Sequence, residues 1–108
     1  MANTFKLKTK ASVGVTTTGI YVVPSSTTTV VIGITASNVS GNNINVGIGI
    51  TRAAADDIHL MKNVPIPQGS SFEFMAGNKI VLETTDTITA KSDVGNSLDV
   101  ALTIMEIT

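Results

Sequence analysis

Side chains branched at Cβ dominate this chain and constrain its fold more than any other feature. The sequence holds 16 Thr, 12 Val and 12 Ile, which make up 40 of its 108 residues, against 5 Leu and 9 Ala. Branched side chains lose rotamer freedom in a helix and pack well on the pleated surface of a sheet. The composition therefore predicts an all-β chain and excludes a helical bundle. A chain of this length has material for one core, so we expect a single domain over residues 1–108.

Apolar and polar residues alternate along the whole chain, and turn residues interrupt the alternation at short intervals. In residues 44–50 every second residue is aliphatic, while Gly47 and Gly49 leave the opposite face bare, so that another group can approach this backbone closely. The predicted strands are residues 5–10, 19–23, 28–39, 44–50, 58–61, 71–75, 79–83, 87–91 and 98–107. Eight or nine short strands favour a single-domain antiparallel β-sandwich of jelly-roll or immunoglobulin-like topology, with a closed barrel as the alternative.

Two segments between these strands are predicted to lie outside the sheets. Pro65 and Pro67 stand one residue apart. Because proline cannot donate a ladder hydrogen bond, we expect residues 63–69 to form an extended connection. Residues 53–57 have helical composition but are too few for a stable helix, which predicts a loop or a single turn.

Apolar and basic residues alternate at the start of the chain, where Phe5 and Leu7 share one face of a strand and Lys6 and Lys8 share the other. Charge along one face suits an edge strand. We expect residues 1–10 to form an arm that pairs with the sheet edge of a partner. The segment lacks the apolar core of a signal peptide, and no segment approaches the roughly 18 apolar residues of a membrane span, so we expect synthesis in the cytoplasm and no membrane contact.

The charge balance bears on possible partners. Seven Lys and Arg residues against eight Asp and Glu residues give no basic field for a phosphate backbone, and one Tyr, three Phe and no Trp give few platforms for base stacking. We therefore expect no binding to nucleic acid. The charged share is 14%, below the usual share of roughly a quarter. Weak charge repulsion tolerates close packing against neighbours, which favours assembly and contacts between copies.

Residues for catalysis or metal binding are scarce. The chain has no Cys, which excludes disulfides and thiolate chemistry. His59 is the sole histidine, and it follows Asp56 and Asp57, but a metal site or a catalytic triad needs further groups that no motif supplies. We expect His59 to be exposed or to lie in an interface. The sequence thus predicts no enzyme, no cofactor and no metal, with lectin-like sugar binding through calcium as the alternative use of the dispersed carboxylates. The triplet that begins at Asn38 has the form of an N-glycosylation acceptor, which so short a motif reaches by chance.

Four segments carry a resemblance to a known group of proteins. They are residues 21–33 (YVVPSSTTTVVIG), 62–71 (KNVPIPQGSS), 77–83 (GNKIVLE) and 105–108 (MEIT). In this order they resemble small virion structural proteins of tailed bacteriophages, notably phages of marine bacteria and cyanobacteria. The segments are spread in order over most of the chain and include no catalytic motif. It implies a non-enzymatic β-domain that assembles on the phage particle.

The sequence lacks the repetitive shaft and the aromatic-rich tip of a receptor-binding fibre, which favours a capsid decoration or cement protein located in the virion. Such a protein would bind the major capsid protein or other virion proteins, bridge neighbouring capsid subunits and contact its own copies. The alternatives are a tail-associated adaptor of the fibre, baseplate or neck, and a carbohydrate-binding β-module. The predicted interface residues are Ala2, Phe5, Leu7, Pro65, Ile66, Pro67, Phe72, Phe74 and Met75. For Phe72 and Phe74 a place in the core is the favoured interpretation.

Overall fold

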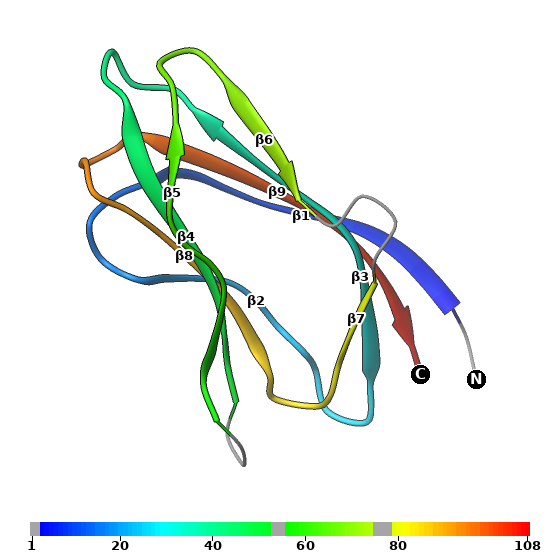
Figure 1. Cartoon of the computed structure of the whole chain (residues 1–108). Coiled ribbons are helices and arrows are strands. Elements are labelled where there is room, and N and C mark those ends of the chain that lie inside the picture. The colour runs from blue at the N-terminus through cyan, green and yellow to red at the C-terminus, as the bar shows by residue number, and fades with distance from the viewer. Residues whose placement is uncertain (1–2, 53–55, 75–78) are drawn as a thin grey trace.

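A computed structural model describes residues 3–52, 56–74 and 79–108, with the side chain of Phe74 outside the description. These residues form nine antiparallel strands and no helix, which confirms the predicted all-β sandwich (Figure 1). The strands are β1 (Asn3–Val13), β2 (Thr18–Val22), β3 (Thr28–Asn38), β4 (Ile44–Thr51), β5 (Ile58–Ile66), β6 (Ser71–Phe74), β7 (Ile80–Leu82), β8 (Thr87–Ser92) and β9 (Leu98–Ile107). Residues 53–55 of the predicted loop lie outside the described residues.

The strands form two sheets whose order identifies the topology. Sheet A has the order β1-β9-β3-β6, with β7 also paired to β3, and sheet B has the order β2-β8-β4-β5. The pairs are nested, because the first strand joins the last, the second joins the second to last, and so on inward to β4 and β5. This is a long hairpin rolled into two sheets, the jelly roll. An immunoglobulin sandwich instead places its first two strands side by side in one sheet.

The core lies between the two sheets and follows the predicted alternation. In β9 every second residue from Leu98 onward is buried. Leu102 and Ile104 of sheet A and Ile48 and Ile88 of sheet B are all 0% exposed and belong to one continuous apolar cluster. Burial of a branched or aliphatic side chain of this size contributes about 1.5–3 kcal/mol. The apolar side chains that alternate along the strands thus hold the two sheets together.

Strand β5 is longer than the sequence predicts, and residues 63–66 belong to it rather than to an extended connection. Pro65 pairs with Asn45 of β4, and Ile66 pairs with Ile44. The prediction was wrong because β5 is the edge strand of sheet B, and an edge strand accepts a proline whose missing N–H has no ladder partner. Ile66 is 1% exposed and lies in the core, so its side chain is not available to a partner, contrary to the predicted interface role.

Two β-bulges interrupt the pairing of β5 with β4. The register steps from Val46 opposite Val64 to Ile48 opposite Met61, which leaves one extra residue on β5, and a second step before His59 leaves another. Asn63 in the first bulge has a φ of 53°, in the left-handed region. Bulges of this kind bend a strand and make it a poor template for pairing with another chain.

Asn38 ties the end of β3 to the neighbouring loops. Its Nδ2 donates to the carbonyl oxygens of Asn42, at 2.7 Å, and Ile66, at 2.9 Å, while its Oδ1 accepts from the backbone N–H and the hydroxyl of Ser40. The residue is 4% exposed. An amide nitrogen that is buried and donates two hydrogen bonds is not accessible to a glycan, so the acceptor motif has a structural role in the fold.

Candidate interaction surface

Residues 3–10 form part of the sandwich as the outermost strand of sheet A, and the contact of this segment with a partner stays a prediction. Strand β1 pairs with β9 without interruption from Asn3 opposite Ile107 to Lys10 opposite Val100. One edge of β1 is thus paired within the chain. Because β1 is the outermost strand of sheet A, its other edge faces solvent. Ala2 lies outside the described residues.

The pairing also determines which way the side chains of β1 point. Residues directly opposite each other on neighbouring strands share a face of the sheet. Lys6, Lys8 and Lys10 stand opposite Ile104, Leu102 and Val100, which are core residues. The lysines therefore face the interior side of sheet A, at its rim. Phe5 and Leu7 face outward and are 69% and 65% exposed.

A buried polar cluster holds the lysines on that side. The Nζ of Lys6 lies 2.8 Å from Oε1 of Glu106, and the hydroxyl of Tyr21 donates to Oε2 of Glu106 at 2.5 Å. The Tyr21 hydroxyl also lies 2.8 Å from Oγ1 of Thr29, and the Nζ of Lys8 lies 5.9 Å from the centre of the Tyr21 ring. An ammonium group so close to a buried carboxylate compensates the cost of burying that charge. The cluster therefore favours the orientation of β1 that leaves Phe5 outside.

The titration behaviour of these groups reflects the same contacts. Burial, and then the hydrogen bond to Glu106, raise the pKa of Tyr21 to about 12. The hydrogen bond from Lys6, and then that from Tyr21, lower the pKa of Glu106 below its ordinary value, against the opposing effect of burial. Glu106 is thus a charged acceptor at neutral pH, and Tyr21 is a neutral donor.

An apolar row crosses the outer face of sheet A and includes Phe5. The register places Phe5 opposite Met105, Met105 opposite Val30, and Val30 opposite Val81. One residue thus comes from each of the four neighbouring strands β1, β9, β3 and β7, and we call these four residues the outer row. Phe5 and Val81 at its ends are 69% and 61% exposed, and the two middle residues are half-buried. Figure 1 shows these strands in the layer that carries both chain ends.

The outer row is unusual for a sandwich of this kind. An antiparallel sheet with one face on the core normally places polar residues on the other face. A contiguous exposed apolar patch on a protein surface marks a site of interaction with another molecule. Leu7 stands two residues along β1 from Phe5 on the same face and extends the patch. The outer face of sheet A is therefore the strongest candidate for a protein interface.

The remaining predicted interface residues lie elsewhere. Phe72 pairs with the core residue Ala36, so it faces the interior side of sheet A near its edge, where it is 37% exposed. Phe74, also in β6, pairs with Ile34 of β3. Met75 lies outside the described residues. Pro65 and Pro67 are exposed at the end of sheet B. The structure thus places Phe5 and Leu7 on one surface and separates them from the proline segment.

Sequence reasoning missed three of the four residues of the outer row, although a signal was present. Val81 stands between two apolar residues, Ile80 and Leu82, and Val30 and Met105 each have an apolar residue on one side in the chain, Val31 and Ile104. A strand alternates its side chains between two faces, so an uninterrupted apolar run places every second residue on the face away from the core. Apolar runs in an otherwise alternating β chain thus indicate an exposed apolar face.

In the part of the chain that the structure describes, the residues around His59 do not form a metal centre. His59 is exposed on β5, and Oδ1 of Asp57 accepts a hydrogen bond from the backbone N–H of Arg52 at 3.0 Å. Within residues 3–52, 56–74 and 79–108, no group of three or more His, Cys, Asp or Glu side chains is arranged to hold a metal ion. In the same part of the chain there is no helix long and apolar enough to cross a membrane.

Fold and surface together define a jelly-roll sandwich with an exposed apolar row on one sheet. No protein family model, curated protein sequence or solved structure matches this chain.

Proposed function

We propose that this chain is a non-enzymatic virion protein of a tailed bacteriophage, which binds the capsid as a decoration or cement protein. The observation that supports this function is the outer row, because it leaves apolar side chains in water that only a partner can cover. The jelly roll is an architecture shared by viral capsid proteins and lectins, so the fold is compatible with the proposal without assigning it.

In the proposed mechanism the outer face of sheet A binds across neighbouring copies of the major capsid protein. Each square ångström of apolar surface that the contact removes from water contributes about 25 cal/mol before the costs of association. Contact with two neighbours at once would resist their separation under the pressure of packaged DNA. The rigid sandwich behind the face suits this role, because the strands of the row are held by ladders on both sides or by the core.

The test is co-sedimentation of the purified protein with empty capsids of its parent phage. A Phe5→Ser and Val81→Ser double variant removes both exposed ends of the outer row and is expected to weaken binding at least about tenfold. Val39→Ser is the matched control, because Val39 is 54% exposed but stands in the turn after β3, away from the row. Equal binding by both variants would overturn the assignment of the surface.

Mass spectrometry of capsids separated from tails tests the location. The proposal requires the protein in the capsid fraction. Its presence in the tail fraction alone would replace the decoration role by that of a tail adaptor, and its absence from both would overturn a virion role.

A further inference from the structure

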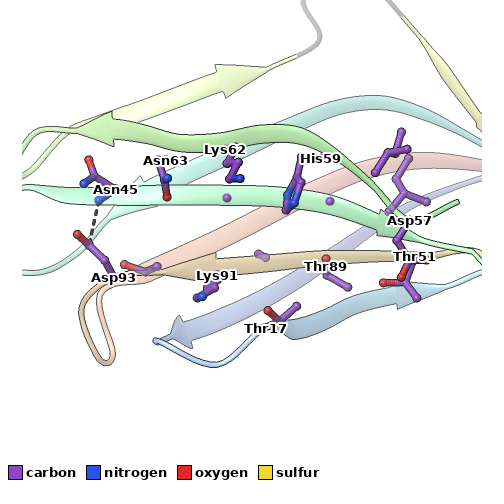
Figure 2. Close-up of a pocket in the computed structure, with 16 residues that line it drawn as sticks. Thr17, Asn45, Thr51, Asp57, His59, Lys62, Asn63, Thr89, Lys91 and Asp93 are labelled. Atoms are coloured by element: carbon purple, nitrogen blue, oxygen red, sulfur yellow. Dashed lines mark hydrogen bonds between the residues drawn. The ribbon is translucent and has the colours of Figure 1, made fainter.

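The outer face of sheet B, on the opposite side of the molecule from the outer row, carries a groove of about 430 Å³ (Figure 2). Its floor is β4, and its walls come from β5 and β8 on either side, with Thr17 before β2. The volume lies within the range of about 300–1,000 Å³ typical of ligand pockets. The groove is two strand spacings wide, about 9.5 Å, and follows the strand direction, so it matches the shape of a single extended chain.

The groove exists because two consecutive rungs of sheet B have glycine at their centre. Each rung places one side chain from β8 and one or two from β5 on either side of the bare position, as Figure 2 shows for the labelled residues. In the first rung Gly47 of β4 lies between Lys91 of β8 and the β5 bulge that contains Lys62 and Asn63. In the second rung Gly49 lies between Thr89 of β8 and His59 of β5.

The fold requires only one of these two glycines. A Cβ at Gly49 would come within 2.8 Å of the carbonyl oxygen of Ile58, so the bulged β5 backbone excludes any side chain there. A Cβ at Gly47 would meet its nearest neighbour, the carbonyl oxygen of Met61, at an ordinary 3.5 Å, and Gly47 does not have a positive φ. Glycine inside a strand is destabilising, so Gly47 carries a cost that packing does not explain. Space for a ligand between Lys62 and Lys91 explains it.

The groove presents more donors than acceptors. The side chains of Lys62, Lys91 and His59 make no hydrogen bond or ion pair within the described part of the chain. The two carboxylates of the lining, Asp93 and Asp57, lie at the two ends of the groove and each accept one backbone hydrogen bond through Oδ1, from Asn45 at 2.9 Å and from Arg52 at 3.0 Å. The two ammonium groups stand between these ends, on either side of Gly47. A ligand with acceptor oxygens and negative charge would therefore complement the unpaired ammonium groups.

The backbone of the floor discriminates between two kinds of extended anion. An acidic peptide gains most of its affinity on a sheet from main-chain hydrogen bonds to a free strand edge. Here β4 is paired with β8 on one side and β5 on the other, so its backbone groups are already used in the ladders. Recognition thus falls to the amides, hydroxyls and ammonium groups of the side chains. These suit the hydroxyls and carboxylates of a sugar.

We propose that the groove binds an acidic oligosaccharide. One sugar ring would lie over Gly47, and carboxylates of the oligosaccharide would bind Lys62 and Lys91. Thr17, Asn45 and Thr89 line the same groove and supply hydroxyl and amide contacts to the ring hydroxyls. The site is on sheet B and the outer row is on sheet A, so the proposal stands or falls independently of the capsid-binding role.

Isothermal titration calorimetry of the full chain at low salt tests the site, with tetragalacturonate as the acidic probe. A neutral galactose tetramer and a short polyglutamate peptide serve as comparison ligands. We expect binding of the acidic sugar and at least about tenfold weaker binding of both comparison ligands. Lys62→Gln and Lys91→Gln should each weaken the binding of tetragalacturonate about tenfold, because each removes one charge-assisted hydrogen bond. Gly47→Val should abolish it.

Two control variants separate the site from general effects. Lys79→Gln removes an exposed lysine beside β7 of sheet A, and Gly33→Val fills a β3 position where a Cβ would meet nothing within 4 Å. Both should bind tetragalacturonate as the unmodified protein does, and circular dichroism checks that every variant is folded. Three results would overturn the proposal: no binding of tetragalacturonate at millimolar concentration, binding that survives Gly47→Val, or tighter binding of polyglutamate, which would make the ligand an acidic peptide.

Discussion

The two glycines of β4 allow a sharp test of the packing of sheet B, because they differ only in what an added methyl group would meet. Replacing glycine with alanine inside a strand removes a conformational penalty of about 0.5–1 kcal/mol. At Gly47 the new Cβ would lie at an ordinary contact distance of 3.5 Å from its nearest neighbour. We therefore expect Gly47→Ala to stabilise the protein by about 0.5–1 kcal/mol.

Gly49→Ala should act in the opposite direction. Its Cβ would lie 2.8 Å from the backbone oxygen of Ile58 and 3.4 Å from Oγ1 of Thr89. The threonine can rotate, but the oxygen belongs to the bulged β5 ladder and moves only with the strand. Forced shifts of this kind cost about 1–3 kcal/mol, which exceeds the gain in conformational entropy. Because the conformational gain is common to both variants, they should differ in unfolding free energy by the cost of the forced shift, about 1–3 kcal/mol.

Urea unfolding followed by circular dichroism measures this difference, with thermal unfolding as a second readout. For a domain of this size 1 kcal/mol shifts Tm by about 4 °C. Gly47→Ala should raise Tm and Gly49→Ala should lower it. Destabilisation of both to the same extent would refute the argument, because it would mean that the Ile58 oxygen does not set the limit at Gly49.

Two further predictions concern the buried polar groups. Glu106 has a lowered pKa in the folded state, so its contribution to stability is complete above the ordinary glutamate pKa of 4.5 and is lost as the pH falls through the lower folded value. Unfolding between pH 2 and 6 should therefore show a weaker acid dependence in Glu106→Gln than in the unmodified protein, and an equal dependence in the two proteins would contradict the role of Glu106. Asn38→Ala leaves two carbonyl oxygens without their donor and should cost about 2–4 kcal/mol in urea unfolding. Asn43→Ala removes one exposed hydrogen bond and should cost less than about 1 kcal/mol, so similar losses in the two variants would contradict the role of Asn38.

The β-sandwich could be predicted from the sequence because the patterns that indicate it, alternation and composition, are local. Alternation with a period of two determines which residues of β4 and β9 are buried, and composition excludes helices. The choice of a jelly roll over an immunoglobulin-like fold could not be predicted, because it depends on which distant strands pair, and alternation is the same in both. The prediction at Pro65 was wrong for a related reason. A strand can contain this proline because β5 is an edge strand, and the position of β5 in the sheet depends on distant pairing.

Only part of the candidate surface could be predicted, because local pattern identifies exposed residues but not the distant strands beside them. Phe5 and Leu7 stand out because they alternate with lysines, but local pattern cannot tell which of the two faces of β1 is turned inward. The answer lies in the contact of Lys6 with Glu106, 100 residues along the chain. Likewise the bare face at Gly47 and Gly49 was visible in the sequence, whereas the lysines and threonine beside it come from two other strands.

The edges of the two sheets differ in a way that limits how copies of this chain can join. Among the described strands, β1 is a long edge with regular register from Asn3 to Lys10, whereas β2, β6 and β7 are short and β5 is bulged and contains Pro65. A molecule with a single competent edge can pair in this way with one other copy only. Two β1 strands that meet antiparallel are related by a two-fold axis, and the contact closes on itself. Edge-to-edge pairing through β1 therefore ends in a pair and cannot propagate into a fibre.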